Sequence, residues 1–300
     1  MMLYDLIAPA KLNLFLHVVG RRADGYHLLQ TVFRFIDLAD TIHIDATDSS
    51  EIIRESDMPG VAPHDDLVVR AAKALQRVTG VKRGAAIRVD KRIPTGGGLG
   101  GGSSDAATVL IALNRLWQTG LSRQALMQIG LELGADVPVF IFGQNAFAEG
   151  IGERLTAVDL PPQAYVVIQP VQNVPTVGVF QSSDLTRNTP QVKITDFSGN
   201  PVGFGHNDLQ PVVLSMYPVM QDVYKWLVKA GCHARMTGSG ACFFTQSTDP
   251  DEAQLVRQKI LNELHKEVTA VAGGSQQVPI QAIFACSGLT EHPLRHWLES

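Results

Sequence analysis

The stretch from Pro94 to Trp117, PTGGGLGGGSSDAATVLIALNRLW, decides the fold because it places six glycines directly before a helix pattern. Glycine is entropically costly to order and adds no side chain to a core, so such a cluster indicates a need for bare backbone. The amides of such a loop can form a nest for oxyanions, and the helix start adds unpaired N–H groups and a positive dipole end. We therefore predict a phosphate-binding loop between a strand and a helix. A flexible linker fits poorly, because both flanks are strongly patterned.

The spacing within this loop differs from the two commonest nucleotide-binding loops. The segment GLGGGS does not keep the GxGxxG spacing of dinucleotide-binding folds, which disfavours a nicotinamide-dependent dehydrogenase. A Walker A loop needs a Lys before its Ser or Thr, and no Lys stands there. The loop therefore predicts phosphate binding without identifying the ligand.

The composition is that of a globular protein with a sizeable core. The chain has 300 residues, of which 45% are hydrophobic and 18% charged, which suits one large or two ordinary domains. A formal net charge of −4 gives no basic excess for nucleic acid. The sequence shows no apolar run of bilayer length and no signal-peptide pattern, so we expect no membrane partner. Three cysteines without a CxxC pair indicate buried thiols in a reducing cytoplasm: Cys232, Cys242 and Cys286.

The residue pattern predicts a mixed α+β chain. In the first half we expect strands over 12–20, 31–37, 40–46, 85–93 and 137–143, and helices over 65–80, from Ser103 or Ser104 as N-cap to Trp117, and over 122–133. In the second half we expect a strand over 164–170, a long loop over 182–206, a helix pair broken near Pro218 over 208–231, a strand–turn–strand over 232–246, a helix over 249–268 and a strand over 277–287. A soft boundary near 155–165 divides the chain into domains 1–160 and 161–300.

The glycine loop resembles the phosphate loop of the GHMP kinases, whose pattern is roughly Pro-x-x-x-Gly-Leu-Gly-Ser-Ser-Ala. Pro94, Gly98, Leu99 and Gly100 match that pattern. Three further segments resemble the same family and follow in family order: 8–33, 133–153 and 234–244. The resemblance implies the two-domain α+β GHMP kinase fold, with a ribosomal S5 domain 2-like nucleotide-binding domain followed by a ferredoxin-like α/β substrate domain. It also implies ATP and Mg²⁺ as cofactors.

The resemblance implies catalytic roles for Asp136 and Lys11. Transfer of the γ-phosphate of ATP to a hydroxyl needs an in-line acceptor, charge neutralisation and often a base. Asp136, in the segment GADVPVF, would accept the hydroxyl proton, and Lys11, in PAKLN, would be its partner and polarise the hydroxyl. Asn13 lies two residues after Lys11, hence on the same face of a strand, and could hold the substrate hydroxyl or phosphate. The alternatives are that Asp136 is a loop carboxylate and Lys11 a surface Lys, neither with a catalytic role.

The glycine following Gly100 and the segment DGYH resemble one branch of the family, which phosphorylates a small alcohol carrying cytidine diphosphate in isoprenoid-precursor synthesis. By this resemblance Tyr26 stacks on the cytosine and His27 hydrogen-bonds its edge. Phe180 resembles the second stacking wall, and Thr176 resembles a hydroxyl of the substrate pocket. Packing in a core is the alternative for both aromatic residues.

The resemblance also implies a nucleotide-binding set around the loop. Lys91 and Asp66 resemble neighbours of the adenine pocket, but Asp66 departs from the Asn expected there and cannot donate a hydrogen bond while ionised. One of two adjacent serines, Ser103 or Ser104, would contact Mg²⁺, and the sequence does not decide which. The expected phosphate loop comprises Pro94, Thr95, Gly96, Gly97, Gly98, Leu99, Gly100, Gly101, Gly102, Ser103 and Ser104.

Two alternative functions remain open at this point. One is a different small-molecule kinase of the family, such as a homoserine or mevalonate kinase. The other is a catalytically silent nucleotide sensor, which the presence of both Lys11 and Asp136 argues against, because binding alone needs no base. We expect a monomer or a weak homodimer.

Overall fold

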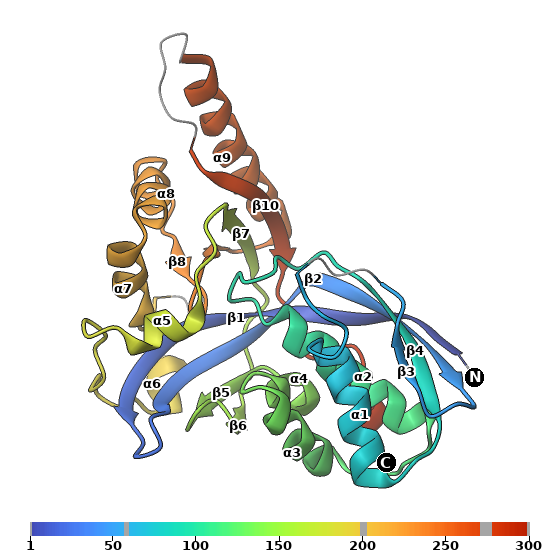
Figure 1. Ribbon diagram of the computed structural model, residues 1–300. Helices are drawn as coiled ribbons and strands as arrows, with labels where there is room; N and C mark the ends of the chain where they lie inside the picture. Colours follow the sequence, from blue (N-terminus) through green and yellow to red (C-terminus); the bar gives the residue numbers. More distant parts are fainter. Residues whose placement is uncertain (1, 57–59, 199–202, 271–277, 299–300) are drawn as a thin grey trace.

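A hairpin of two long strands joins the two halves of the molecule (Figure 1). The computed structural model describes residues 2–56, 60–198, 203–270 and 278–298. Strands β1 (Met2–Arg21) and β2 (His27–Thr47) pair antiparallel along their whole length. The expectation of two separate strands over 31–37 and 40–46 is therefore wrong. Pro9 pairs with Ala39 and Ala10 pairs with Ile36, so Asp37 and Leu38 form a bulge in β2. The strand therefore continues through the residues that separate the two expected strands.

The first sheet is built around β2. One edge of β2 pairs with β1, and the other edge pairs with β4 (Gly84–Asp90) and β5 (Ala146–Glu149) at different points along its length. Strand β3 (Ile52–Arg54) lies parallel outside β4, and β6 (Arg154–Ala157) lies antiparallel outside β5. This arrangement leaves the start of β1 and the end of β2 in one lobe and their turn end in the other.

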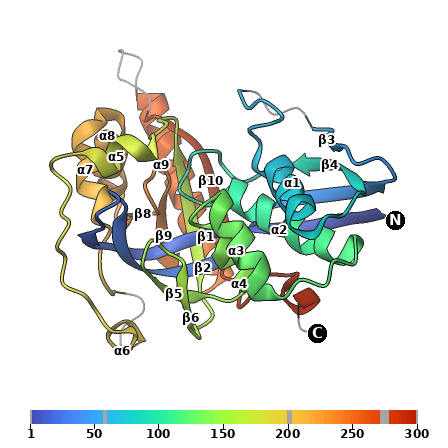
Figure 2. The ribbon, with the colours of Figure 1, turned by 60° about the horizontal axis from the view of Figure 1, so that its bottom comes forward.

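Helices α1 to α4 lie against one half of the hairpin in both views (Figures 1 and 2). Their bounds are α1 (Leu67–Thr79), α2 (Gly101–Leu116), α3 (Arg123–Leu133) and α4 (Val137–Phe142). The sequence offers Asp65 or Asp66 as the cap of α1, and it is Asp66 that accepts from the Val68 amide. Ser122, where the sequence indicates that α3 opens, caps it through the Ala125 amide.

Helix α4 corrects the expectation of a strand over 137–143. Its residues Val137 to Ile141 are buried, and it packs between α2 and α3. An apolar run this short carries no periodicity that could separate a buried strand from a buried helix. The Pro138 at its start and the left-handed Gly143 after it (φ 76°) are the signals that fit a helix.

The expected serine cap of α2 is also wrong. The N-cap is Gly100, in a left-handed conformation (φ 72°), and it makes no side-chain capping bond. The Ser104 hydroxyl instead donates to the Pro9 carbonyl at 2.7 Å, deep in the fold. The start of α2 therefore keeps its amides free of any side-chain cap, and this end faces the cavity described below.

The second sheet has the order β10–β7–β9–β8 and is antiparallel. As predicted, a helix pair breaks at Pro218, and a strand–turn–strand and a terminal helix and strand follow. The bounds are β7 (Ala164–Pro170), α7 (Leu209–Met216), α8 (Pro218–Lys229), β8 (Arg235–Met236), β9 (Phe243–Ser247), α9 (Pro250–Ala270) and β10 (Ile280–Ser287). The segment expected as a loop over 182–206 contains the short helix α6 (Ile194–Ser198), follows α5 (Thr176–Gln181), and includes 199–202, which lie outside the described residues.

Three apolar clusters hold the fold together. One fills the space between the first sheet and α1–α4, and another lies between the second sheet and α7–α9. A third, with Leu12, Phe15, Val167 and Phe244, packs the hairpin against β7 and β9. The chain end returns to the first lobe, where Leu294 joins its core and the 3₁₀ turn Arg295–Leu298 contacts α2. The domain limits 1–160 and 161–300 stay a prediction.

The structure also bears on the expected state of the cysteines and on membrane-spanning helices. All three cysteines are free and buried, as predicted. Among the described residues, no helix has both the length and the apolar character that a bilayer crossing needs.

The buried His292 makes stability depend on pH. Burial, with a smaller effect of Arg123, lowers its pKa from 6.5 to about 3. The unfolded chain therefore binds the extra proton between these values, so this contribution is present above pH 6.5 and is lost as the pH falls, by up to about 1.4 kcal/mol per pH unit. We expect His292→Gln to make the loss of stability between pH 6 and 4 shallower in urea titrations.

The exposed His64 supplies the matched control for this experiment. His64→Gln should leave the pH dependence of stability unchanged. Buried His17, whose pKa burial also lowers, will keep part of the dependence in both variants. Identical slopes for His292→Gln and the unaltered protein would contradict the assignment.

Candidate active site

A cavity of about 720 Å³ lies where the hairpin, the glycine loop, α4, α5 and the loop 238–240 meet. Sequence reasoning placed its residues in five separate segments of the chain, 11–13, 26–27, 96–103, 136 and 176–180, and the structure brings them together. The predicted site residues that line it are Lys11, Asn13, Tyr26, His27, Gly96, Gly98, Gly100, Ser103, Asp136, Thr176 and Phe180. Predicted site residues that do not line it are Asp66, Lys91, Pro94, Thr95, Gly97, Leu99, Gly101, Gly102 and Ser104.

Lys11 and Asp136 form an ion pair at the floor of this cavity. Lys11 Nζ lies 3.1 Å from Asp136 Oδ2, and the two side chains are 3% and 34% exposed. Lys11 projects from the middle of β1, whereas Asp136 is the residue from which α4 begins. The carboxylate can thus face a ligand while the ammonium stays buried behind it.

Asn13 fixes the position of the Lys11 ammonium. Lys11 Nζ donates to Asn13 Oδ1 at 2.6 Å, and Asn13 Nδ2 donates to Thr31 Oγ1 at 2.9 Å. The backbone N–H of Asn13 donates to Thr237 Oγ1 at 3.0 Å, which links β1 to the loop of the second lobe. Sequence reasoning placed Asn13 on the face of Lys11 correctly but missed Thr31 and Thr237, whose separation along the chain hides the contact.

The glycine loop is docked edge to edge on the 237–242 segment. The Ala241 and Cys242 amides donate to the carbonyls of Gly96 and Gly97, each at 3.1 Å. Gly98 has φ 74°, and a Cβ there would lie 2.2 Å from the Thr237 carbonyl oxygen. The junction of the two lobes thus requires some of these glycines on structural grounds alone.

At the end of the loop, the backbone can approach a ligand in the cavity. A Cβ on Gly100 would lie 3.0 Å from Phe140 and 3.1 Å from the Lys11 side chain, so the chain passes close to the ion pair. The uncapped amides at the start of α2 follow directly, and Ser103 lines the cavity beside them. This arrangement suits an anionic group at the helix N-terminus. Of the two serines, the cavity contains Ser103, since the Ser104 hydroxyl is bound to Pro9.

The opposite end of the cavity, which we call the base end, consists of Tyr26, His27, Thr176 and Phe180. The His27 and Phe180 rings lie 5.1 Å apart at 34°, and Tyr26 stands 60% exposed at the rim. Thr176 Oγ1 lies 2.7 Å from Ser239 Oγ. This end therefore offers an aromatic wall, an imidazole and hydroxyls to a ligand.

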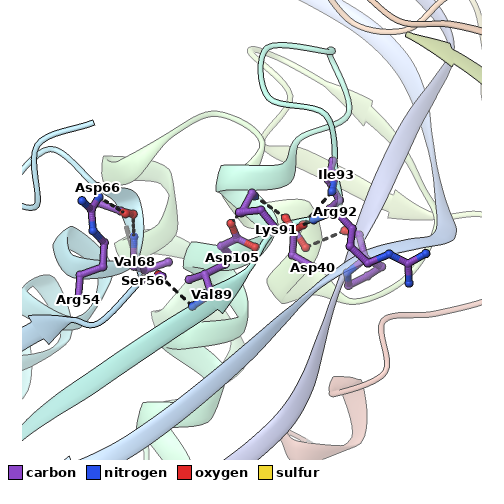
Figure 3. Close-up of polar contacts among 12 residues, drawn as sticks. Asp40, Arg54, Ser56, Asp66, Val68, Val89, Lys91, Arg92, Ile93 and Asp105 are labelled. Carbon is purple, nitrogen blue, oxygen red and sulfur yellow. Dashed lines mark hydrogen bonds and ion pairs between the residues drawn. The ribbon is translucent and has the colours of Figure 1, made fainter. Parts of the chain in front are cut away.

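Lys91 is tied to two carboxylates beside the cavity (Figure 3). Its ammonium bonds to Asp40, and to Asp105 Oδ2 at 2.7 Å. Asp40 also accepts from the Arg92 and Ile93 amides, at 2.5 and 2.8 Å. Burial raises the pKa of Asp105 to about 8, although Lys91 acts in the opposite direction. Asp40 and Asp105 thus hold residues 91–93, which connect the end of β4 to the glycine loop.

Asp66 forms a buried ion pair with Arg54, which sequence reasoning missed (Figure 3). Arg54 Nη1 donates to Asp66 Oδ2 at 2.9 Å, and Val68 N donates to Oδ1 at 3.0 Å. Each side chain is 6% exposed. The Asp found where Asn was expected is thus neutralised by an Arg on β3.

Loss of the Asp66 carboxylate should be costly to stability. We expect Asp66→Ala to reduce the free energy of unfolding by about 3 kcal/mol or more, since it removes a helix cap and leaves Arg54 buried without its partner. Asp66→Asn should cost less, because it keeps the cap. Urea denaturation of both variants measures this, and equal stabilities of the two would contradict the role of the ion pair.

Comparisons with known proteins agree with this geometry. Residues 66–144 match the model of the GHMP kinases N terminal domain, and residues 198–266 match that of the GHMP kinases C terminal domain. The chain is 58% identical, over the full length of both proteins, to the 4-diphosphocytidyl-2-C-methyl-D-erythritol kinase of Bordetella bronchiseptica. It is 53% identical to the kinase of the same name from Thiobacillus denitrificans, over 96% of each chain. The chain belongs to the GHMP kinase family.

Solved structures support the same conclusion about this GHMP kinase. A crystal structure of 4-(cytidine 5'-diphospho)-2C-methyl-D-erythritol kinase matches with a TM-score of 0.77 and 32% identity, over 96% of this chain and 99% of that one. Homoserine kinase from Cytophaga hutchinsonii shares the fold at 16% identity, with a TM-score of 0.68 over 97% of this chain and 95% of that one. The predicted two-domain α+β GHMP kinase fold is confirmed, and the family uses ATP as its phosphate donor.

Proposed function

We propose that this kinase transfers the γ-phosphate of ATP to the 2-hydroxyl of 4-diphosphocytidyl-2-C-methyl-D-erythritol, in the non-mevalonate route to isoprenoid precursors. The observation that carries the proposal is that one cavity holds the Lys11–Asp136 pair, the end of the glycine loop and an aromatic base end. The substrate named for its 58% identical relative has a reactive alcohol at one end and a cytosine at the other, which fits this layout.

Asp136 acts as the base at the reacting hydroxyl. Its carboxylate is one-third exposed to the cavity, and the 3.1 Å contact with buried Lys11 fixes its orientation. Lys11 neutralises charge that develops on the hydroxyl oxygen, and the Asn13 amide holds the ammonium in place. Positioning and charge neutralisation of this kind account for most of the catalysis in phosphoryl transfer.

The phosphates of ATP bind at the glycine loop and the start of α2. The uncapped amides after Gly100 and the helix dipole favour an anion there, and a side chain on Gly100 would crowd Phe140 and Lys11 beside that position. Within the described residues, no group of three or more His, Cys, Asp or Glu side chains is arranged to hold a metal ion. This fits Mg²⁺, which binds mainly through substrate phosphates and water, and Ser103 is the side chain that would complete its shell. Bound Mg²⁺ would neutralise charge on the phosphates.

The base end binds the cytosine of the substrate. Phe180 and Tyr26 stack on the ring, His27 hydrogen-bonds its edge, and Thr176 contributes a hydroxyl. The position of these residues in the same cavity as the ion pair supports these roles. Lys91 and Asp66 support the ATP site without contacting the nucleotide, since both side chains are held in ion pairs outside the cavity. We further propose that the protein works in the cytoplasm as a monomer or weak homodimer and binds no nucleic acid.

Release of ADP, coupled to a second enzyme, tests the proposed reaction. The purified protein with Mg-ATP should turn over 4-diphosphocytidyl-2-C-methyl-D-erythritol, and neither mevalonate nor homoserine. Turnover of mevalonate or homoserine would show that the protein is a kinase but would refute the cytosine site. ATP binding without turnover of any compound would favour a nucleotide sensor.

A further inference from the structure

Arg187 contacts both sides of the base end. Its Nε donates to His27 Nε2 at 3.0 Å, and its Nη2 donates to the Phe180 carbonyl at 3.2 Å and the Ser182 carbonyl at 2.6 Å. Its Nη1 donates to the Leu185 carbonyl at 3.0 Å. One side chain from the long 182–206 segment therefore ties the start of β2 to the end of α5.

This contact determines which nitrogen of His27 carries the proton. A guanidinium donates hydrogen bonds and never accepts them, so His27 Nε2 must be unprotonated. Burial, together with the charges of Arg187 and Arg21, lowers the pKa of His27, so the imidazole is neutral at pH 7. Its single proton then lies on Nδ1, which is the only donor left on the ring, and His27 is one of the residues that line the cavity.

We propose that Arg187 is a positioning residue for base recognition, which fixes His27 as the Nδ1–H tautomer and thereby selects cytosine over uracil. The inference rests on the proposed function and states how the base end of the cavity distinguishes cytosine from uracil. Cytosine presents acceptors at both N3 and O2, whereas uracil presents an N–H donor at N3. The two bases share the O2 acceptor, so the discrimination lies at N3: a histidine N–H directed at that atom bonds to cytosine and opposes the N–H of uracil.

The Arg187 contact is one of two bonds that hold residues 187–189 against the hairpin. Thr189 N donates to the Val18 carbonyl at 3.1 Å, so the segment is bonded to β1 close to the Arg187 contact. Arg187 is half-buried, and all of its bonds from the guanidinium go to groups in or next to the base end. These contacts involve neither Lys11 nor Asp136, so removal of Arg187 should affect base binding and spare the chemical step.

Substrate kinetics test this division of roles. For Arg187→Met we expect the KM of the cytidine compound to rise about tenfold with kcat within about threefold, because a neutral histidine released from Arg187 can take either tautomer. Its preference for the cytidine compound over the uridine analogue should fall about tenfold, since discrimination then rests on shape. Arg187→Lys keeps one cationic donor for His27, and it should restore the base preference more fully than the KM.

The exposed Arg77, paired with Glu132 on the far helices, is the matched control, and Arg77→Met should change none of these values. A folded Arg187→Met variant with an unchanged base preference would overturn the proposal.

Nitrogen-15 NMR of the unaltered, histidine-labelled protein tests the tautomer without any variant of Arg187. The His27 signals, identified by their loss in His27→Gln, should show a protonated Nδ1 and an unprotonated Nε2. A protonated Nε2 would overturn the proposal even if Arg187→Met failed to fold. Absence of turnover of both pyrimidine compounds by the unaltered protein would instead refute the proposed function, and the NMR spectrum tests the Arg187 contact independently of it.

Discussion

Asp136→Asn should lower kcat about 10²- to 10⁴-fold, which is the usual contribution of a positioned general base. The amide keeps the shape of the carboxylate and can still accept from Lys11, but it cannot take the hydroxyl proton. In the proposed function ATP binds at the glycine loop and not through the Asp136 carboxylate, so the KM for ATP should change less than about threefold. Coupled ADP release with the cytidine compound measures both quantities.

The exposed Asp222 on α8 provides the control for this substitution. Asp222→Asn makes the same chemical change outside the cavity and should leave kcat unaltered. If Asp136→Asn retained kcat within tenfold, the carboxylate would not be the base. Lys11 would then remain as the main source of charge neutralisation.

Gly98→Ala should destabilise the protein by about 3 to 5 kcal/mol, which combines a strained left-handed backbone with a forced backbone contact. The added Cβ would meet the Thr237 carbonyl oxygen at 2.2 Å and that of Gly240 at 3.0 Å. Both neighbours are backbone atoms, and the Thr237 carbonyl already accepts from Gly240 N at 3.0 Å, so neither can yield cheaply. We expect the midpoint of thermal unfolding to fall by roughly 10 °C and the KM for ATP to rise.

Gly102 offers a matched comparison within the same loop. A Cβ there would meet only Leu67 Cδ1, at 3.4 Å, and the residue lies in the first turn of α2. Gly102→Ala should therefore leave the unfolding midpoint nearly unchanged, since Ala is the better helix former. Equal midpoints for the two alanine variants would show that the junction with 237–242 does not constrain the loop.

Most elements of the fold could be predicted because their signals are local. The cap at Asp66, the left-handed Gly80 and the break at Pro218 each act within a few residues. The exceptions are elements that depend on distant contacts. Helix α4 is apolar on all sides and takes its form from burial against α2 and α3, and β2 continues through its bulge because β1 pairs along all of it.

The same distinction applies to the site. The residues proposed to contact a ligand lie in recognisable sequence motifs, and the structure brings Lys11 and Asp136 together as expected. The residues that hold them lie far away in the chain and carry no local signal. Arg187 binds a histidine 160 residues before it, and Thr237 binds Asn13 224 residues before it. Arg54 was hidden for another reason, since only the unexpected Asp66 indicated that a cation was needed.

The long hairpin has a consequence for synthesis of the chain on the ribosome. The turn end of β1 needs partners that are made much later: Val18 N donates to Asp208 Oδ2 at 2.6 Å, and Leu16 packs against α7 and β9. At about 5–20 residues per second, Asp208 emerges roughly 10 to 40 s after Val18. The part of the first lobe that precedes β7 can assemble during that interval, while the turn end of the hairpin stays apolar and uncovered. This end of β1 is therefore where a nascent chain is most open to chaperones and to aggregation.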